Sequence, residues 1–576
     1  MSAEKKLAWF EAFSAVNQQF IDHTVRRVRA AGVDRIPEIL RELTAAYSRK
    51  PERWAEIQHR YQRSQWQLWS DFSRASVDGK PSAIVAPQVD DKRFRDPAWN
   101  ALPFFDYMKQ SYLLTANGLH DLIESAELDP VRKNQLAFHA QQYLDAIAPS
   151  NFLATNPEAL QLALETGGQS LARGLENLAR DVERGRISMS DESSFEVGKN
   201  LAVTAGAVVF ENDYLQLIQY APLTETVYRR PLLIVPPVIN KYYILDLQPE
   251  NSFVRFALQQ GHTVFMISWR NVGGELGGAT WDDYVESGVE KAMRVVRAIV
   301  RADKINALGF CIGGTLLATT LAVQRVRKRN PVASLTLLAT MIDFADPGKI
   351  SAYMDDAYLS ECETRYAGGE IMHGAELAEA FANLRANELV WSYVVNNYLK
   401  GQTPRAFDFL YWNADTVNLP GALYAFLVKK LYHENRLKAP GQLSVCGAGV
   451  DLGRVDMATY LLASREDHIV PWQTAYASTR LLRGQLEFVL AASGHIAGVI
   501  NPPEKGRRNY WINPDHPLDG AEWLSGAASV AGSWWTHWSA WIARHAGKKI
   551  KARGALGNTI YEPIEAAPGR YVKASS

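Results

Sequence analysis

Apolar residues in the first 190 positions recur at the spacing of helix faces. Two of these faces consist of Leu7, Phe10, Phe13, Val16 and Phe20, and of Trp54, Ile57, Tyr61, Leu68 and Phe72. Residues 151–182 repeat the helical pattern, with a helix start at Asn156-Pro157. We therefore predict a mainly helical N-terminal domain over residues 1–197.

The pattern changes near Gly198, where short apolar runs of strand length begin. These runs are 203–210, 215–220, 232–235, 263–267, 305–308, 335–338, 460–462 and 488–490. Helical stretches at 281–302 and 315–327 separate several of the runs. Apolar strands that alternate with helices predict an α/β domain over residues 198–576, built on a mostly parallel sheet with helices on both faces.

Residues 343–445 interrupt this alternation. They are rich in aromatic residues and helical in pattern, without clear core strands. They lie between the strand at 305–308 and the strand at 460–462. An insertion at this place has the position of a cap over the carboxyl edge of the sheet. The last stretch, 554–576, has no periodic pattern and is predicted to be irregular.

Composition places the chain among ordinary globular proteins. The 576 residues are 47% hydrophobic and 22% charged, and the 62 basic side chains balance the 62 acidic ones. This balance gives no indication of nucleic-acid binding. The three cysteines, Cys311, Cys362 and Cys446, form neither a disulfide framework nor a metal-binding spacing, which fits a reducing cytoplasm. No signal peptide or transmembrane run is evident, and we expect no metal and no bound cofactor.

The strongest chemical signal is Gly309-Phe310-Cys311-Ile312-Gly313-Gly314. It has the form of a nucleophile elbow, G-x-S-x-G, with cysteine in the serine position, between a predicted strand and a predicted helix. The tight turn leaves no room for β-carbons at Gly309 and Gly313, and the helix N-terminus behind Cys311 favours a thiolate. These features indicate the α/β-hydrolase fold. The alternative is a buried structural cysteine after a core strand.

A cysteine nucleophile needs a base and an acid that orients the base. In the α/β-hydrolase fold the acid and then the histidine follow the nucleophile along the chain, each after a strand. Asp467 follows the strand that ends near Ala463, and His495 follows the next strand. We therefore predict a triad of Cys311, Asp467 and His495. His468 is a rival base beside Asp467, whereas Asp451 and Asp456 are rival acids that precede their strand.

Acyl transfer also needs backbone donors for an oxyanion. One predicted donor is the N–H group of Ile312, directly after the nucleophile. The second should come from the loop 236–240 after an early strand. Its two prolines lack N–H groups, which leaves Val238 or Ile239, and we take Val238 as the candidate. The alternative is a rigid turn without this role.

The chain resembles the polyhydroxyalkanoate synthases, and the resemblance spans most of its length. It is carried by the Cys311 elbow together with 94–99, 151–157, 231–246, 268–271, 409–415, 465–472 and 567–572. The Gly-Phe-Cys-x-Gly-Gly form and the long N-terminal region are similar to class I enzymes. The resemblance implies that short-chain (R)-3-hydroxyacyl-CoA, such as 3-hydroxybutyryl-CoA, is joined into polyester with release of the CoA that the substrate carries. It maps the nucleophile, acid and base onto Cys311, Asp467 and His495.

The resemblance also implies a homodimer in the cytoplasm, at the surface of polymer granules and in contact with the growing polyester and granule-surface proteins. The helical N-terminal domain would support dimerisation and granule association. Two alternatives stay open at this point. A thioesterase on the same fold would pass the acyl group to water, and a granule-surface protein with a vestigial triad would release no CoA.

Overall fold

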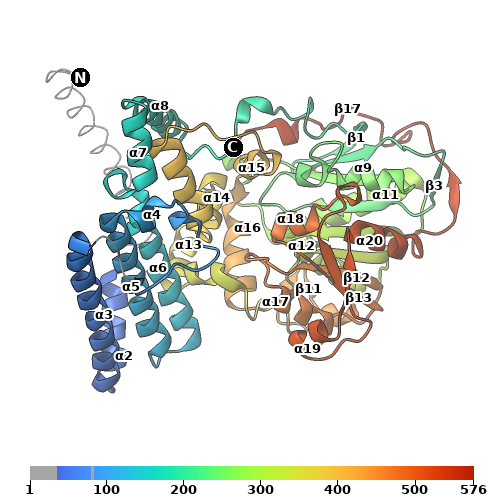
Figure 1. Cartoon of the computed structure of the whole chain (residues 1–576). Coiled ribbons are helices and arrows are strands. Elements are labelled where there is room, and N and C mark those ends of the chain that lie inside the picture. Colours follow the sequence, from blue (N-terminus) through green and yellow to red (C-terminus); the bar gives the residue numbers. More distant parts are fainter. Residues whose placement is uncertain (1–35, 79–82, 576) are drawn as a thin grey trace. The chain divides into compact units, whose positions relative to one another are not determined.

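The computed structural model describes residues 36–78 and 83–575, so the apolar positions from Leu7 to Phe20 lie outside the described residues. The chain forms two compact units (Figure 1). The first comprises Met1–Asp191 and Glu379–Arg405, and the second comprises Glu192–Ala378 and Ala406–Ser576. The boundary thus lies six residues before the predicted one at 197/198.

The described part of the first unit is helical, as the apolar spacing predicts. Its longer helices are α2 (Ile36–Tyr47), α3 (Pro51–Asp78), α5 (Pro103–Ser125), α6 (Pro130–Ile147), α7 (Pro157–Glu165) and α8 (Gln169–Arg184). The side chain of Asn156 accepts a hydrogen bond from the N–H group of Ala159 and caps α7. This explains why the Asn-Pro pair marks a helix start.

Part of the predicted cap belongs to this first unit. The π-helical segments Asn387–Trp391 and Val394–Leu399 pack their apolar side chains against α8. Asn177 on α8 donates hydrogen bonds to the carbonyl groups of Asn397 at 2.9 Å and Gln402 at 3.0 Å. The interval 343–445 is therefore divided between the units, because the apolar face of 387–399 is buried by an N-terminal helix.

An eleven-stranded sheet forms the centre of the second unit among the described residues. Its order is β15-β14-β13-β12-β7-β6-β4-β5-β2-β1-β17, and the six strands from β13 to β5 are parallel. The strands are β1 (Gly206–Glu211), β2 (Leu215–Tyr220), β4 (Leu232–Val235), β5 (Val264–Trp269), β6 (Ile305–Phe310), β7 (Val332–Leu338), β12 (Ala458–Ser464), β13 (Leu486–Ala491), β14 (Asn509–Ile512), β15 (Ala528–Ala531) and β17 (Glu565–Ala566). The α/β prediction is confirmed, whereas the predicted irregular tail contributes β17, which pairs with β1.

Helices α9 (Phe253–Gln259), α11 (Lys291–Val300), α12 (Ile312–Val326) and α20 (Trp534–Ala543) accompany the sheet. The four tryptophans of α20 are buried, and three of them pack around Phe253 of α9, with ring centroids 4.8 to 5.8 Å apart. This cluster accounts for several of the chain's 16 tryptophans as core residues. Such aromatic burial is a large contribution to the stability of this unit.

The remainder of the cap interval, with α13 (Asp356–Tyr366), α15 (Asp408–Ala414), α16 (Gly421–Phe426) and the π-helix Leu427–His433, lies in the second unit. Its two ends are fastened together. Lys438 forms an ion pair with Asp343 at 2.8 Å, and Asn435 donates a hydrogen bond to the same carboxylate at 2.9 Å. These bonds fix the base of the insertion beside the carboxyl end of β7.

Candidate active site

Three predicted residues stand at the carboxyl ends of parallel strands. Cys311 directly follows β6, Asp467 follows β12, and His495 follows β13. Parallel strands end at one edge of the sheet, so the topology alone brings the three loops to the same side. Strand β7 lies between β6 and β12, and the carbonyl group of its last residue, Leu338, accepts a hydrogen bond from the Cys311 N–H group at 2.9 Å.

The backbone at Cys311 has the strained conformation of a nucleophile elbow. Its φ is 53° and its ψ is −130°, and it directly precedes the first turn of α12. A β-carbon at Gly309 would overlap the backbone of Gly314, and one at Gly313 would overlap the carbonyl oxygen atoms of Val235 and Pro236. The close approach that the sequence predicted at both glycines is therefore present.

Replacing Gly313 with alanine should lower activity by about a hundredfold or more, because the new methyl group would push the 235–238 loop away from the elbow. We also expect a loss of about 1–3 kcal/mol in the free energy of unfolding. Steady-state rates and urea titrations measure the two effects. Gly274→Ala is the matched control, because nothing lies within 4 Å of a β-carbon there. A Gly313→Ala enzyme whose rate is within twofold of the parent rate would contradict the assignment of the 235–238 loop to the oxyanion site.

His495 and Asp467 form a buried pair. Asp467 Oδ2 lies 2.6 Å from His495 Nδ1, and the two residues are 9% and 6% exposed. The other carboxylate oxygen accepts hydrogen bonds from the N–H groups of Ile469 at 2.8 Å and Val470 at 2.9 Å. The carboxylate is therefore held from both sides, and it directs the Nδ1–H group of the imidazole toward itself.

The His495 imidazole also lies beside the nucleophile elbow. Cys311 directly follows Phe310, whose ring stacks on the imidazole with centroids 5.5 Å apart. Burial lowers the pKa of His495, but the charge of Asp467 and its hydrogen bond, together with the nearby Cys311, outweigh it and raise this pKa to about 10. The arrangement stabilises the charge that the imidazole carries once it has accepted a proton.

This pKa predicts a pH-dependent contribution of His495 to stability. The pKa rises from about 6.5 in the unfolded chain to about 10 in the folded one. The contribution is thus complete below pH of about 6.5 and is lost as the pH rises toward 10. We expect the difference in unfolding free energy between the parent and His495→Gln to shrink over this window. Urea titrations across the pH series would contradict this if the difference grew with pH.

The rival residues take other places. Asp451 caps a short 3₁₀ turn through the N–H group of Gly453, and Asp456 forms an ion pair with Arg325. His468 adjoins Asp467 on the same loop, and it is the imidazole of His495 that the Asp467 carboxylate binds. The structure thus brings together Cys311, Asp467 and His495, and it does not bring the rival acids to them.

The candidate oxyanion donors flank the elbow. The loop that carries Val238 follows β4, packs against Gly313, and is fixed by a hydrogen bond from Trp269 Nε1 to the carbonyl group of Pro236 at 3.0 Å. Within the described part of the chain, the N–H groups of Val238 and Ile312 donate to no protein acceptor. Val238 is 2% exposed, so these donors face a site from which protein has excluded most solvent.

Sequence reasoning did not single out Tyr432, on the π-helix Leu427–His433 of the cap. Burial raises the pKa of its hydroxyl, and the Cys311 charge raises it further. The ring also packs edge-on against Phe344 at 4.9 Å. The cap therefore places an aromatic hydroxyl close to the nucleophile. Only its place in the aromatic interval could have indicated it, because no motif surrounds it.

The cap is also joined to the segment after the oxyanion loop. Asp415 forms an ion pair with Lys241 at 2.6 Å and accepts a hydrogen bond from Tyr243 at 2.7 Å. Trp412 Nε1 donates to the Lys241 carbonyl group at 2.7 Å. Two of the sequence motifs, 239–246 and 409–415, are thus direct partners, and their contacts hold the cap to the loop that follows β4.

Across 36–78 and 83–575, no group of histidine, cysteine, aspartate and glutamate has the arrangement of a metal site. Within the same residues, no helix has the length and apolar character needed to cross a membrane.

Comparison with known proteins gives two family matches and several relatives. Residues 90–257 match the family described as poly-beta-hydroxybutyrate polymerase N-terminus, and residues 232–502 match the alpha/beta hydrolase fold. The chain is 50% identical to a poly(3-hydroxyalkanoate) polymerase subunit of Cupriavidus necator, over 91% of this chain and 89% of that protein. It is 38% identical to the Rhizobium meliloti subunit, over 95% and 91% of the two chains. It is 40% identical to polymerase 1 of Ectopseudomonas oleovorans, over 86% and 88%.

Solved structures give a more distant likeness. A monoacylglycerol lipase of Paleococcus ferrophilus aligns with 49% of this chain and 90% of its own, at 11% identity and a TM-score of 0.32. A 2-hydroxy-6-oxo-6-phenylhexa-2,4-dienoate hydrolase from Rhodococcus aligns with 51% and 92%, at 12% identity and a TM-score of 0.30.

Proposed function

Because this chain belongs to the poly(3-hydroxyalkanoate) polymerase family of acyltransferases, we propose that it joins (R)-3-hydroxyacyl groups from their CoA thioesters into polyester through a covalent thioester on Cys311. The observation that carries this proposal is the hydrogen-bonded pair of His495 and Asp467 beside the Cys311 elbow at one edge of the sheet. Short monomers such as 3-hydroxybutyryl-CoA are the proposed substrates, and no cofactor other than the CoA that they bring is required.

In the first step His495 accepts the Cys311 proton, and the thiolate attacks the carbonyl carbon of the CoA thioester. The N–H groups of Ile312 and Val238 would stabilise the oxyanion that forms. Collapse of this intermediate breaks the bond to CoA sulfur, and CoA leaves with the proton that His495 returns. The acyl group is then a thioester of Cys311, and the charge balance of the site is restored.

In the second step a 3-hydroxyl group attacks the acyl carbon on Cys311, so that an ester bond forms while the thioester bond to Cys311 sulfur breaks. We propose that His495, rather than Asp467, accepts the hydroxyl proton and passes it to the departing Cys311 sulfur, which regenerates the thiol. One Asp467 oxygen is bound by His495 and the other by the N–H groups of Ile469 and Val470, so the carboxylate offers little access to a substrate hydroxyl. A dry site is needed here, because water would release free hydroxy acid.

The cap residues support this exclusion of water. Tyr432 stands near Cys311, and the contacts of Asp415 with Lys241 and Tyr243 fasten the cap beside the site.

We also propose that the protein works as a homodimer at the surface of cytoplasmic polymer granules, with its N-terminal helices contributing to the dimer interface and to the contact with the granule. Sedimentation of the full chain tests the dimer, and imaging of a labelled chain in polymer-producing cells tests the granule location.

The defining experiment supplies (R)-3-hydroxybutyryl-CoA and measures both the CoA released and the polymer formed. Equal amounts of released CoA and polymerised monomer units would support the proposal. Released CoA with free 3-hydroxybutyrate would instead identify a thioesterase. No release from this substrate or from longer-chain monomers would favour a granule-surface protein without activity.

A further inference from the structure

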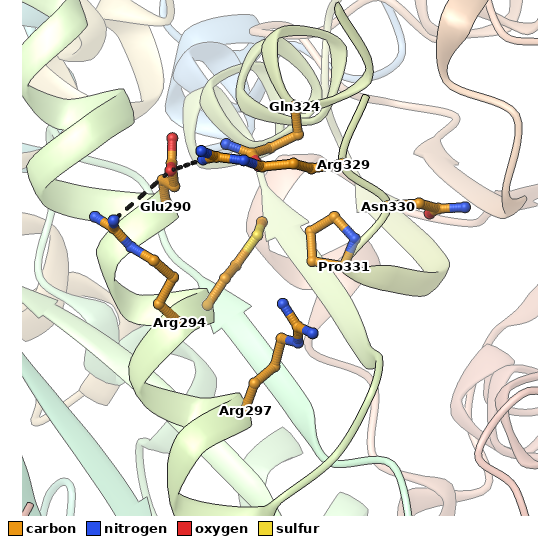
Figure 2. A pocket seen from close by; sticks show the side chains of 8 residues that line it. Glu290, Arg294, Arg297, Gln324, Arg329, Asn330 and Pro331 are labelled. Carbon is orange, nitrogen blue, oxygen red and sulfur yellow. Dashed lines mark hydrogen bonds and ion pairs between the residues drawn. The ribbon is translucent and has the colours of Figure 1, made fainter. Parts of the chain in front are cut away.

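A cavity of about 390 Å³ lies in the second unit at the end of α12 that is remote from Cys311 (Figure 2). It is lined by Glu290, Met293, Arg294, Arg297, Gln324, Arg329, Asn330 and Pro331. Gln324 is thirteen positions after Cys311 on a continuous helix, which separates the two by about 20 Å along the helix axis. The cavity is therefore distinct from the candidate active site.

The charges around the cavity are mostly positive. Three guanidinium groups line it, those of Arg294, Arg297 and Arg329, against the single carboxylate of Glu290. Glu290 is buried and lies 2.9 Å from Arg329 and 4.0 Å from Arg294, as the dashed lines of Figure 2 show. One carboxylate thus holds two of the cations in place and leaves the cavity with a net positive charge.

Two donors in the lining have no acceptor. Gln324 is only 3% exposed, and its Nε2 atom is enclosed without a hydrogen-bonding partner among the described residues. The Nε atom of Arg297 is enclosed in the same way, and no carboxylate of the described chain pairs with Arg297. Figure 2 shows the Arg297 guanidinium directed toward the space beside Pro331. Buried donors without acceptors are rare and costly in folded proteins.

We propose that this cavity binds a small molecule that carries phosphate groups. The lining supplies guanidinium groups and the unpartnered Nε2 donor of Gln324, and the ligand would supply the missing acceptors and the negative charge. Guanidinium groups bind phosphate oxygens in pairs, and the enclosed positions of Gln324 Nε2 and Arg297 Nε make their bonds with an anion strong. The volume suits a small ligand rather than a polymer.

Calorimetric titration of pyrophosphate into the full chain, at constant ionic strength, tests this proposal. We expect saturable binding that weakens by about tenfold or more in Arg297→Gln and in Gln324→Leu. Arg255→Gln, which removes an exposed cation from α9 outside the cavity, should bind as the parent does. Equal weakening in Arg255→Gln and Arg297→Gln would overturn the proposal, as would the absence of heat in the parent.

A citrate titration and a thermal unfolding measurement test the proposal further. Citrate carries a similar charge on carboxylates, so citrate binding as tight as that of pyrophosphate would overturn the assignment to phosphate. Without any anion, Gln324→Leu should unfold at a temperature no lower than the parent, because its amide donor has no partner to lose. A clear drop would show that Gln324 has a structural partner and would overturn the proposal. Both readouts are independent of polymer synthesis.

Discussion

Replacing Cys311 with alanine should abolish both CoA release and polymer formation, with a rate loss of about 10⁴-fold or more. Cys311 is the side chain that the strained turn after β6 presents to His495, and alanine fits the same backbone without a nucleophile. Chromatographic measurement of CoA and polymer in parent and variant gives the ratio. Circular dichroism and thermal unfolding of both proteins establish that the variant is folded.

Cys446→Ala provides the matched control for this result. Cys446 is also a free cysteine with a positive φ, but its sulfur donates to the carbonyl group of Asp282 at 3.5 Å and hydrogen-bonds no histidine of the described chain. It should keep the parental rate within about twofold. A Cys311→Ala protein that still forms polymer at a comparable rate would refute the covalent mechanism. A mass shift of one acyl group on Cys311, seen after brief exposure to substrate, would support it directly.

Replacing Asp467 with asparagine should lower the rate by about 10³- to 10⁴-fold while leaving the fold intact. The N–H groups of Ile469 and Val470 donate to one oxygen of Asp467, so an amide there would keep its oxygen toward them. Its NH₂ group would then face His495 Nδ1 and force the tautomer that carries the proton on Nε2. That tautomer cannot accept the Cys311 proton.

The pH dependence of the rate distinguishes a catalytic effect of Asp467→Asn from a loss of structure. The parent rate should depend on the ionisation of His495, whose pKa Asp467 raises, so Asp467→Asn should shift the pH profile as well as lower its height. Asp456→Asn is the control, because Asp456 pairs with Arg325 near the surface. If the control loses activity and Asp467→Asn does not, the acid has been assigned to the wrong residue.

The parts of the site that follow from the sheet could be predicted from the sequence. Runs of apolar residues gave the bounds of β2 and β4, and three chemically distinct residues followed three strands in the order that the fold requires. Parallel pairing then leaves little freedom in where those residues meet. The overlap at Gly313 likewise follows from a local motif, since the turn itself demands the close approach.

Other features depend on contacts that the local pattern does not encode. The apolar face of 387–399 reads as helical, but only the tertiary structure shows that α8 covers it rather than the sheet domain. Tyr432 comes near enough to Cys311 to feel its charge only through the path of the cap, and no motif surrounds it. The tail pairs with β1 over only two residues, too few for a period to register. The choice between Val238 and Ile239 depends on backbone direction within one loop.

The division of the chain between its units has a consequence for biosynthesis. Glu379–Arg405 supplies part of the first unit, so the chain passes between the units after residues 191, 378 and 405. The carbonyl group of Tyr398 lies directly against Gly174, and Tyr398 donates a hydrogen bond to Asp181 at 2.7 Å. During translation the N-terminal helices emerge first. The segment 387–399 that covers the apolar surface of α8 leaves the ribosome only after about two hundred further residues have been made. Until then, the nascent chain carries an uncovered apolar face that a chaperone would recognise.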